Sequence, residues 1–256
     1  MGGMIEYAAN GGLSERTASD DQATLERGAA ERPGARPTPG AETTRRAQGY
    51  LARPDGGGTS KGVVVIQEWW GLADHIKDVT ERFAKAGYTA LAPDLWDGKL
   101  TKQPDEAQRL FMALNIADAS KKISGAIAAL HAHGATGKVG VIGFCMGGQL
   151  ALHAGGALPE HVGAVVDFYG IHPQVRPDYA ALKAPVLAII GEKDPTVTPA
   201  TGREIKANVE RHGGQAELHV YPAGHAFFND ARPEAYHAES AADAWQKTLA
   251  FFAKSR

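Results

Sequence analysis

The sequence predicts an α/β fold, with a mostly parallel central sheet and helices on both of its faces. Short apolar runs alternate along the chain with longer segments whose apolar residues recur every three or four positions. The run Gly62–Gln67 (GVVVIQ) is rich in β-branched residues, as expected of a strand buried on both faces. Parallel strands need long connections, and most successive runs are separated by a helix-length segment, so right-handed crossovers are expected.

The predicted strands are apolar runs bounded by turn-forming residues. In the main part of the chain they are Gly62–Gln67, Tyr88–Ala92, Lys138–Ile142, Val162–Phe168, Pro185–Ile190 and Glu217–Tyr221. Two earlier segments, Ile5–Ala8 and Tyr50–Ala52, are expected to pair as a hairpin with an oversized connection.

The predicted helices follow from apolar periodicity and from boundary residues. Asp74 is expected to cap the first helix, which carries Ile76, Val79 and Phe83 and ends at Gly87. The second helix is expected to open at Pro104, with Ala107, Leu110, Phe111 and Leu114 on one face, and the third to carry Ile116, Ile123, Ile127 and Leu130 before Gly134. A fourth helix is expected to start near Gly147, and a fifth to run from Thr198-Pro199 to Gly213-Gly214. The last predicted helix carries Trp245, Leu249 and Phe252.

The composition excludes several classes of protein. The chain has 256 residues, which suits one large domain over residues 1–256, and 43% of them are hydrophobic. A net charge of −2 and a pI near 6.6 argue against nucleic acid as a partner. No apolar run approaches the ~20 residues that cross a bilayer, and the N-terminus lacks the layout of a secretory signal. We therefore expect a cytoplasmic protein with no membrane partner.

A low-complexity loop insertion is expected at about residues 13–47. Between Ser14 and Arg46 the only large apolar residue is Leu25. Such a segment buries too little apolar surface to offset the entropy of ordering it. We expect a surface loop that contributes little to the core.

The clearest candidate for chemistry is the single cysteine, Cys145. It lies in a G-x-nucleophile-x-G elbow, Gly143-Phe144-Cys145-Met146-Gly147, with cysteine in place of the usual serine. Small flanking residues allow a strained residue to project where a strand turns into a helix, and a helix N-terminus favours thiolate. Cys145 is therefore predicted as a nucleophile; the alternative is a small buried hydrophobe. One cysteine also excludes an internal disulfide and an all-cysteine zinc site.

A base and an acid are predicted at the ends of later strands. His225 follows the last predicted strand by a short turn, whereas most of the other histidines fall within helices or in distant loops. Asp194 closes the strand before it and is the first choice to orient the imidazole, with Asp167 and Glu192 as alternatives. The order nucleophile, acid, base is that of the α/β-hydrolase fold.

Oxyanion donors and one unusual carboxylate are predicted around the nucleophile. The backbone N–H groups of Met146 and Trp69 are the candidates to bind a developing oxyanion. Glu68 lies at the end of a buried strand, beside the predicted nucleophile. Either it is an ordinary surface glutamate, or it contacts the thiol and holds it protonated until substrate arrives.

Four stretches carry a resemblance to a known family: VVVIQEWWG, YTALAPDLW, GVIGFCMGG and YPAGHAFFND, with GEKDP between the last two. In them the chain resembles the dienelactone hydrolases (carboxymethylenebutenolidases), over roughly residues 50–256. The resemblance implies Cys145 as nucleophile, His225 as base, Asp194 as orienting acid, and Glu68 as the carboxylate that contacts the resting thiol. It also implies hydrolysis of an enol-lactone through an acyl-enzyme, without metal or organic cofactor.

The substrate pocket departs from the family pattern. Family members hold the substrate carboxylate with two arginines. In this chain Lys99 lies near the position of the first arginine, and Asn229 occupies the position of the second. The pocket is expected to be mostly aromatic, with Trp70, Trp96, Phe144, Tyr169 and Phe227 contributing. We expect an ester or lactone hydrolase that acts as a monomer or weak homodimer. The alternatives are a promiscuous esterase or thioesterase on neutral aromatic esters and a non-catalytic binding protein.

Overall fold

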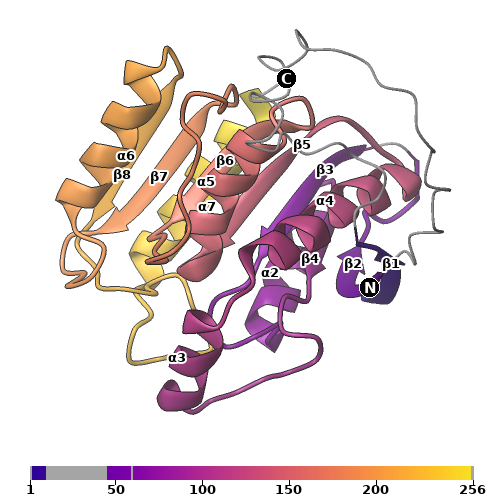
Figure 1. Cartoon of the computed structure of the whole chain (residues 1–256), viewed down its shortest axis with the longest axis horizontal. Helices are drawn as coiled ribbons and strands as arrows, with labels where there is room; N and C mark the ends of the chain where they lie inside the picture. Colours follow the sequence, from indigo (N-terminus) through magenta and orange to yellow (C-terminus); the bar gives the residue numbers. More distant parts are fainter. Residues whose placement is uncertain (1, 10–44, 59, 255–256) are drawn as a thin grey trace, which may run out of the picture.

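Eight strands pair into one sheet in the computed structural model, which describes residues 2–9, 45–58 and 60–254 (Figure 1). The strands are β1 (Gly3–Ala8), β2 (Arg46–Ala52), β3 (Ser60–Ile66), β4 (Tyr88–Pro93), β5 (Ala135–Phe144), β6 (Val162–Phe168), β7 (Val186–Gly191) and β8 (Ala216–Tyr221). Their order across the sheet is β1-β2-β4-β3-β5-β6-β7-β8. Pairing is antiparallel between β1 and β2 and between β2 and β4, and parallel elsewhere. The predicted fold class and the terminal hairpin are both confirmed.

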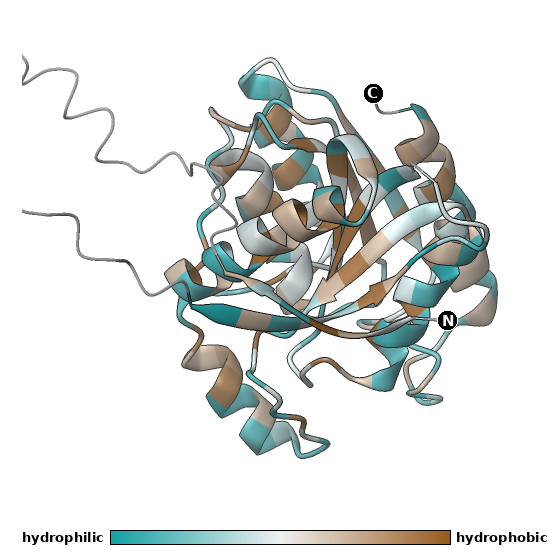
Figure 2. Cartoon of the chain, turned by 90° about the vertical axis from the view of Figure 1, so that its right-hand side faces the viewer, coloured by the Kyte–Doolittle hydropathy of each residue, from teal (hydrophilic) through white to brown (hydrophobic). Residues whose placement is uncertain are grey.

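Helices cover both faces of the sheet. They are α2 (Asp74–Lys85), α3 (Pro104–Met112), α4 (Ile116–Ala132), α5 (Met146–Ala157), α6 (Pro199–Arg211) and α7 (Ala238–Lys254). Helices α4, α5 and α6 share one hydrophobic cluster with the sheet, and α2 and α7 share the other. Figure 2 shows hydrophobic residues gathered along the strands and the inward faces of the helices.

Side-chain alternation in the strands divides the core into these two clusters. In β3, Val64 and Ile66 belong to the cluster under α4 and α5, whereas Val63 and Val65 belong to the one under α2 and α7. All four are at most 1% exposed. A continuous apolar run is therefore what a strand covered on both faces requires.

Two helix boundaries differ from the sequence-based prediction. Asp74 is the first residue of α2 and not its cap, since Ala73 occupies the capping position and no side chain caps the helix there. The Asp74 carboxylate still lies in the positive first turn of the helix, 3.3 Å from Lys77 Nζ. Helix α3 ends at Met112, so Leu114 lies outside it, in the short connection to α4.

The predicted insertion lies almost wholly outside the described residues, which omit 10–44. Its predicted C-terminal limit is wrong, because β2 already begins at Arg46, paired with Ala8. The Ala9 N–H donates to the Arg45 carbonyl at 2.8 Å, so the two ends of the omitted segment meet. None of the helices that the structure describes has the length and apolarity needed to span a bilayer.

Candidate active site

Cys145 stands at the junction of β5 and α5, in a conformation that few residues other than glycine adopt. Its φ is 54° and its ψ is −119°, and it occupies the capping position of α5. The junction is tightly packed, because a Cβ on Gly143 would lie 1.9 Å from the Gly147 carbonyl oxygen. A Cβ on Gly147 would lie 2.4 Å from the Ile66 carbonyl oxygen. The two glycines therefore permit the strained turn that carries the thiol.

His225 and Asp194 meet at the ends of β8 and β7. His225 Nδ1 donates to Asp194 Oδ2 at 2.6 Å, and the Asp194 side chain is fully buried. The other oxygen, Asp194 Oδ1, accepts from the N–H groups of Thr196 at 2.8 Å and Val197 at 2.9 Å. The imidazole and the Cys145 side chain line the same cavity. The structure thus brings together the three residues that the sequence singled out.

These contacts change the titration of both members of the pair. Burial by itself would lower the pKa of His225, but the hydrogen bond with Asp194 and the nearby Cys145 thiol outweigh burial and raise the pKa to about 10. Burial would raise the pKa of Asp194, yet the hydrogen bonds from His225 and from backbone N–H groups hold it below its usual value. The geometry therefore favours imidazolium beside carboxylate.

Asp167, the alternative acid, lies elsewhere in the fold. It is 0% exposed in β6, and neither carboxylate oxygen has a side-chain hydrogen-bond partner among the described residues. Burial raises its pKa to about 7. Asp194, and not Asp167, holds the imidazole of His225.

Glu68 is buried and held by an amide. It is 3% exposed, and its Oε2 accepts from Asn229 Nδ2 at 2.6 Å. Its Oε1 is buried with no hydrogen-bond partner in the described part of the chain, so no hydrogen bond joins it to the thiol there. Burial raises the pKa of Glu68, although His75, Asn229 and His225 oppose this. The reading of Glu68 as a surface residue is therefore wrong.

A cavity of about 380 Å³ contains the thiol and the imidazole. Its lining residues are Glu68, Trp69, Trp70, Gln108, Phe111, Cys145, Ile171, Thr196, His225, Ala226 and Arg232. A second hollow of about 540 Å³ adjoins it and shares Trp70 and Arg232, with Asn229 also in its wall. Both are mixed surfaces in which aromatic and aliphatic groups stand beside a few polar ones.

Five predicted pocket residues line neither hollow: Trp96, Lys99, Phe144, Tyr169 and Phe227. Phe144 and Phe227 are 0% exposed and pack within the core, where Phe144 stacks on Phe228 with ring centroids 5.2 Å apart. Trp96 is 7% exposed, and its indole donates to the Trp69 carbonyl at 3.1 Å. Lys99 is exposed outside the cavity. The three aromatic side chains belong to the hydrophobic core, Trp96 in the cluster under α4 and α5 and the two phenylalanines in the cluster under α2 and α7.

Tyr169 lies between the core and the site. It is 0% exposed, so it forms no open wall, but its ring centroid lies 5.0 Å from that of His225. Of the predicted pocket residues, Trp70 lines the cavity with the thiol, and Asn229 hydrogen-bonds Glu68, which also lines it.

Arg232 is the functional candidate that the sequence analysis missed. Its guanidinium carbon lies 5.0 Å from the Trp70 ring centroid, and its Nε donates to Glu234 Oε1 at 2.8 Å. It comes after β8 in an irregular loop, where no periodicity marks which side chains face inward. Its position three residues beyond Asn229 was the one available signal of a cation near the site.

Of the two predicted oxyanion donors, Trp69 lines this cavity, whereas Met146 is buried directly after Cys145. Met146 is the first residue of α5, where a backbone N–H has no acceptor within its own helix. Trp69 lies in the turn that follows β3. No group of three side chains suited to hold a metal ion occurs within the described ranges.

Known proteins match most of this chain. The model of the dienelactone hydrolase family matches residues 47–255. The chain is 37% identical to "Protein usf" of Aquifex pyrophilus over 216 residues, covering 81% of this chain and 93% of that protein. It is 30% identical to the "Putative carboxymethylenebutenolidase" of Aquifex aeolicus, with the same coverage. A solved structure titled "Putative Dienelactone Hydrolase", from Klebsiella pneumoniae, superposes with a TM-score of 0.75 at 30% identity, covering 83% of this chain and 95% of that chain.

Proposed function

This chain belongs to the dienelactone hydrolase family, and from that premise we propose that it hydrolyses esters or lactones with Cys145 as its nucleophile. Membership makes it a hydrolase of carboxylic ester bonds. The thiol nucleophile, the acyl-enzyme and the roles of individual residues are the proposal. The observation that carries it is the His225–Asp194 hydrogen bond of 2.6 Å beside a strained cysteine in one cavity.

The proposed reaction has two stages. Cys145 Sγ attacks the carbonyl carbon, His225 holds the thiol proton, and the N–H groups of Met146 and Trp69 bind the oxyanion. Collapse of the tetrahedral intermediate breaks the C–O bond, and His225 gives its proton to the leaving oxygen. His225 then takes a proton from water, whose oxygen attacks the thioester carbon. The C–S bond breaks, the acid product leaves, and His225 returns the proton to the sulfur, which regenerates the thiol.

Glu68 is proposed to control the charge around the thiol. Glu68 lines the cavity that contains Cys145 and His225, and its Oε1 is buried without a hydrogen-bond partner among the described residues. An anion there would oppose thiolate, whereas the neutral form that burial favours would not. Asn229, at the position of a family arginine, holds this carboxyl by hydrogen bonding without adding a charge.

The substrate class is proposed from the cavity lining. Trp70, Phe111 and Ile171 offer apolar contact, and Arg232 is a cation in the same wall. An aromatic or unsaturated ester or lactone that carries a carboxylate would satisfy both. A neutral aromatic ester is the second candidate, because the cation already contacts Glu234 and Trp70.

The proposal is tested by Cys145→Ala and His225→Ala variants, assayed with p-nitrophenyl acetate and with a dienelactone. Both are expected to lose at least about a thousandfold in kcat. Cys145→Ala should melt close to the temperature of the unchanged protein, whereas His225→Ala should melt lower near neutral pH because it loses the ion pair with Asp194. His219→Ala is the matched control, because His219 lies in β8 outside the cavity. Near-normal turnover in either variant would exclude the mechanism.

A further inference from the structure

The turn that carries Trp69 is held by the loop that follows β4. Gly71 N donates to Glu68 O at 3.4 Å, which closes a β-turn whose own hydrogen bond does not use the Trp69 N–H. Trp96 Nε1 donates to the Trp69 carbonyl at 3.1 Å. This bond fixes the carbonyl of the same residue whose N–H is the proposed oxyanion donor.

The next carbonyl of the turn is held from the same loop. Thr101 N donates to the Trp70 carbonyl at 3.2 Å. The two segments also pack without space between them, because a Cβ on Gly71 would lie 2.4 Å from the Lys99 carbonyl oxygen. The position of the turn therefore depends on where the loop of residues 94–101 lies.

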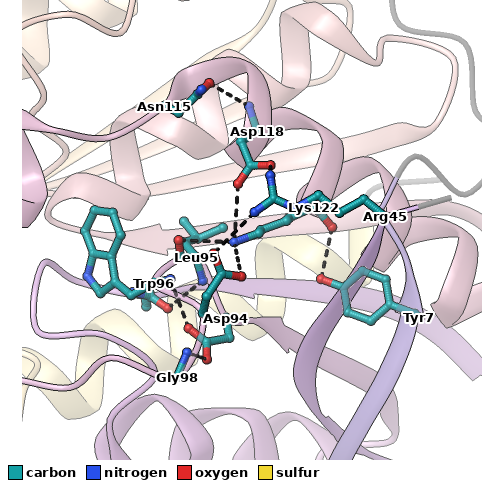
Figure 3. Close-up of polar contacts among 11 residues, drawn as sticks. Tyr7, Arg45, Asp94, Leu95, Trp96, Gly98, Asn115, Asp118 and Lys122 are labelled. Atoms are coloured by element: carbon teal, nitrogen blue, oxygen red, sulfur yellow. Dashed lines mark hydrogen bonds and ion pairs between the residues drawn. The ribbon is translucent and has the colours of Figure 1, made fainter. Parts of the chain in front are cut away.

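Asp94 fixes the start of that loop. One of its oxygens accepts from Trp96 N at 3.0 Å and the other from Gly98 N at 2.6 Å (Figure 3). Leu95 N donates to the side-chain oxygen of Gln67 at 3.2 Å, which ties the loop to the end of β3. The indole of Trp96 thus extends from a backbone whose hydrogen bonds are largely satisfied.

A buried ammonium group fixes the other side of the loop. The Lys122 side chain, in α4, is 0% exposed, and its Nζ lies 2.7 Å from Asp97 Oδ1 and 3.3 Å from Asp118 Oδ2. It also donates to the Leu95 carbonyl at 3.4 Å; Figure 3 shows Lys122 beside Asp118 and Leu95. A buried charge is tolerated only when such acceptors surround it, so the lysine and the loop constrain each other. Asp97, the ion-pair partner of Lys122, has a φ of 52°, so the loop bends sharply at this residue.

We propose that Trp96 is a positioning residue for the Trp69 oxyanion donor and that Lys122 fixes the loop that presents the Trp96 indole. This inference rests on the proposed function, since it assigns Trp96 a part in the step in which negative charge develops on the carbonyl oxygen. Trp96 touches no substrate in this scheme; it acts through the Trp69 peptide. Displacing an oxyanion donor weakens binding of the transition state more than binding of the ester itself.

The test compares two reactions of Cys145 in a Trp96→Phe variant, which keeps an aromatic ring and removes the N–H donor. Hydrolysis of p-nitrophenyl acetate needs the oxyanion donor, whereas disulfide formation with methyl methanethiosulfonate involves no carbonyl. We expect kcat for the ester to fall about tenfold or more, KM to stay within about twofold, and the thiosulfonate rate to be unchanged. Trp245→Phe, which changes a tryptophan packed against Phe83 outside the cavity, is the matched control and should alter neither reaction.

The outcomes separate this inference from the proposed function. Normal ester turnover in Trp96→Phe would overturn the inference, and so would equal slowing of both reactions, because the indole would then only support the fold. If thiosulfonate modification of the unchanged protein left its esterase activity intact, the thiol mechanism itself would fail. The chain has 1 cysteine, so the modified residue is not in doubt.

An Asp97→Asn variant tests the part assigned to Lys122. Asparagine tolerates the positive φ at this position, so the change removes the ion pair without straining the backbone. We expect kcat for the ester to fall about threefold with KM and the thiosulfonate rate unchanged, a smaller effect because Asp118 still holds the ammonium. Ester kinetics identical to those of the unchanged protein would remove Lys122 from the scheme.

Discussion

At the scale of single residues, the imidazole of His225 lies between an aspartate and a thiol, and both change its titration. Its folded pKa of about 10 exceeds the ordinary value of 6.5. A raised pKa means that the folded state binds the proton more tightly than the unfolded chain does. The stability that this supplies is complete below pH 6.5 and is lost as the pH rises through about 10.

Replacing Asp194 by asparagine should remove much of that dependence. The pKa of His225 would fall, so the decline in melting temperature between pH 6.5 and 10 should become shallower than in the unchanged protein. Turnover should drop at least about tenfold, because the imidazolium loses its partner. Asp243→Asn, which alters a carboxylate bonded to Tyr221, serves as the control. Parallel melting profiles for Asp194→Asn and the unchanged protein would contradict the assigned shift.

Arg232 offers a second prediction at this scale. An Arg232→Gln variant should lower kcat/KM for a dienelactone carboxylate about tenfold or more and leave that for a neutral aryl ester within about twofold, because only the first needs the cation. Steady-state kinetics on both substrates measure the difference. Arg203→Gln, which changes an exposed arginine of α6, is the control. Equal losses on both substrates would mean that Arg232 supports the cavity wall and does not select anionic substrates.

At the scale of elements, the junction of β5 with α5 shows why the chain has small residues around its cysteine. Gly147 faces the end of β3, and any side chain there meets backbone rather than a movable side chain. The same close approach brings the first turn of α5 beside the strand that leads to Glu68. The glycines therefore belong to the architecture of the site as well as to the conformation of Cys145.

A Gly147→Ala variant should accordingly be destabilised. Its Cβ would lie 2.4 Å from the Ile66 carbonyl oxygen, so α5 must move away from β3. We expect the free energy of unfolding, measured by urea denaturation, to fall by about 1–3 kcal/mol. Gly3→Ala is the matched control, since a Cβ there meets nothing within 4 Å. Equal stability of the two variants would show that the junction relaxes without cost.

At the scale of the whole molecule, the residues of the proposed active site lie at the carboxyl ends of the parallel strands. Cys145 follows β5, Asp194 follows β7 and His225 follows β8, so residues far apart in sequence meet where the strands end. The antiparallel strands β1 and β2 form one lateral edge of the sheet, separated from β5 by β4 and β3. Changes confined to the connection between those two strands should therefore leave the site intact.

Replacing residues 11–43 by a four-residue Gly/Ser linker should preserve both melting temperature and ester turnover. The Ala9 N–H and the Arg45 carbonyl oxygen are 2.8 Å apart, so a short linker can join the ends, and a shorter loop costs less closure entropy. A longer deletion that includes Arg46 is the contrasting variant. It removes the ion pairs of Arg45 with Asp118 and Asp97 and the first residue of β2, so it should melt at a lower temperature. Loss of folding with the shorter replacement would contradict this account.

The sequence by itself determined the order and type of the strands and helices, though not all of their bounds, and singled out the three residues that meet at the strand ends. Each is marked by local pattern: β-branched runs, three- and four-residue periodicity, and glycines around a cysteine. Only the tertiary structure decided that Trp96 supports the turn of Trp69, that Asn229 holds Glu68, and that Arg232 lines the cavity. Those side chains come from loops without periodicity, whose paths are set by hydrogen bonds and packing between segments distant in the chain.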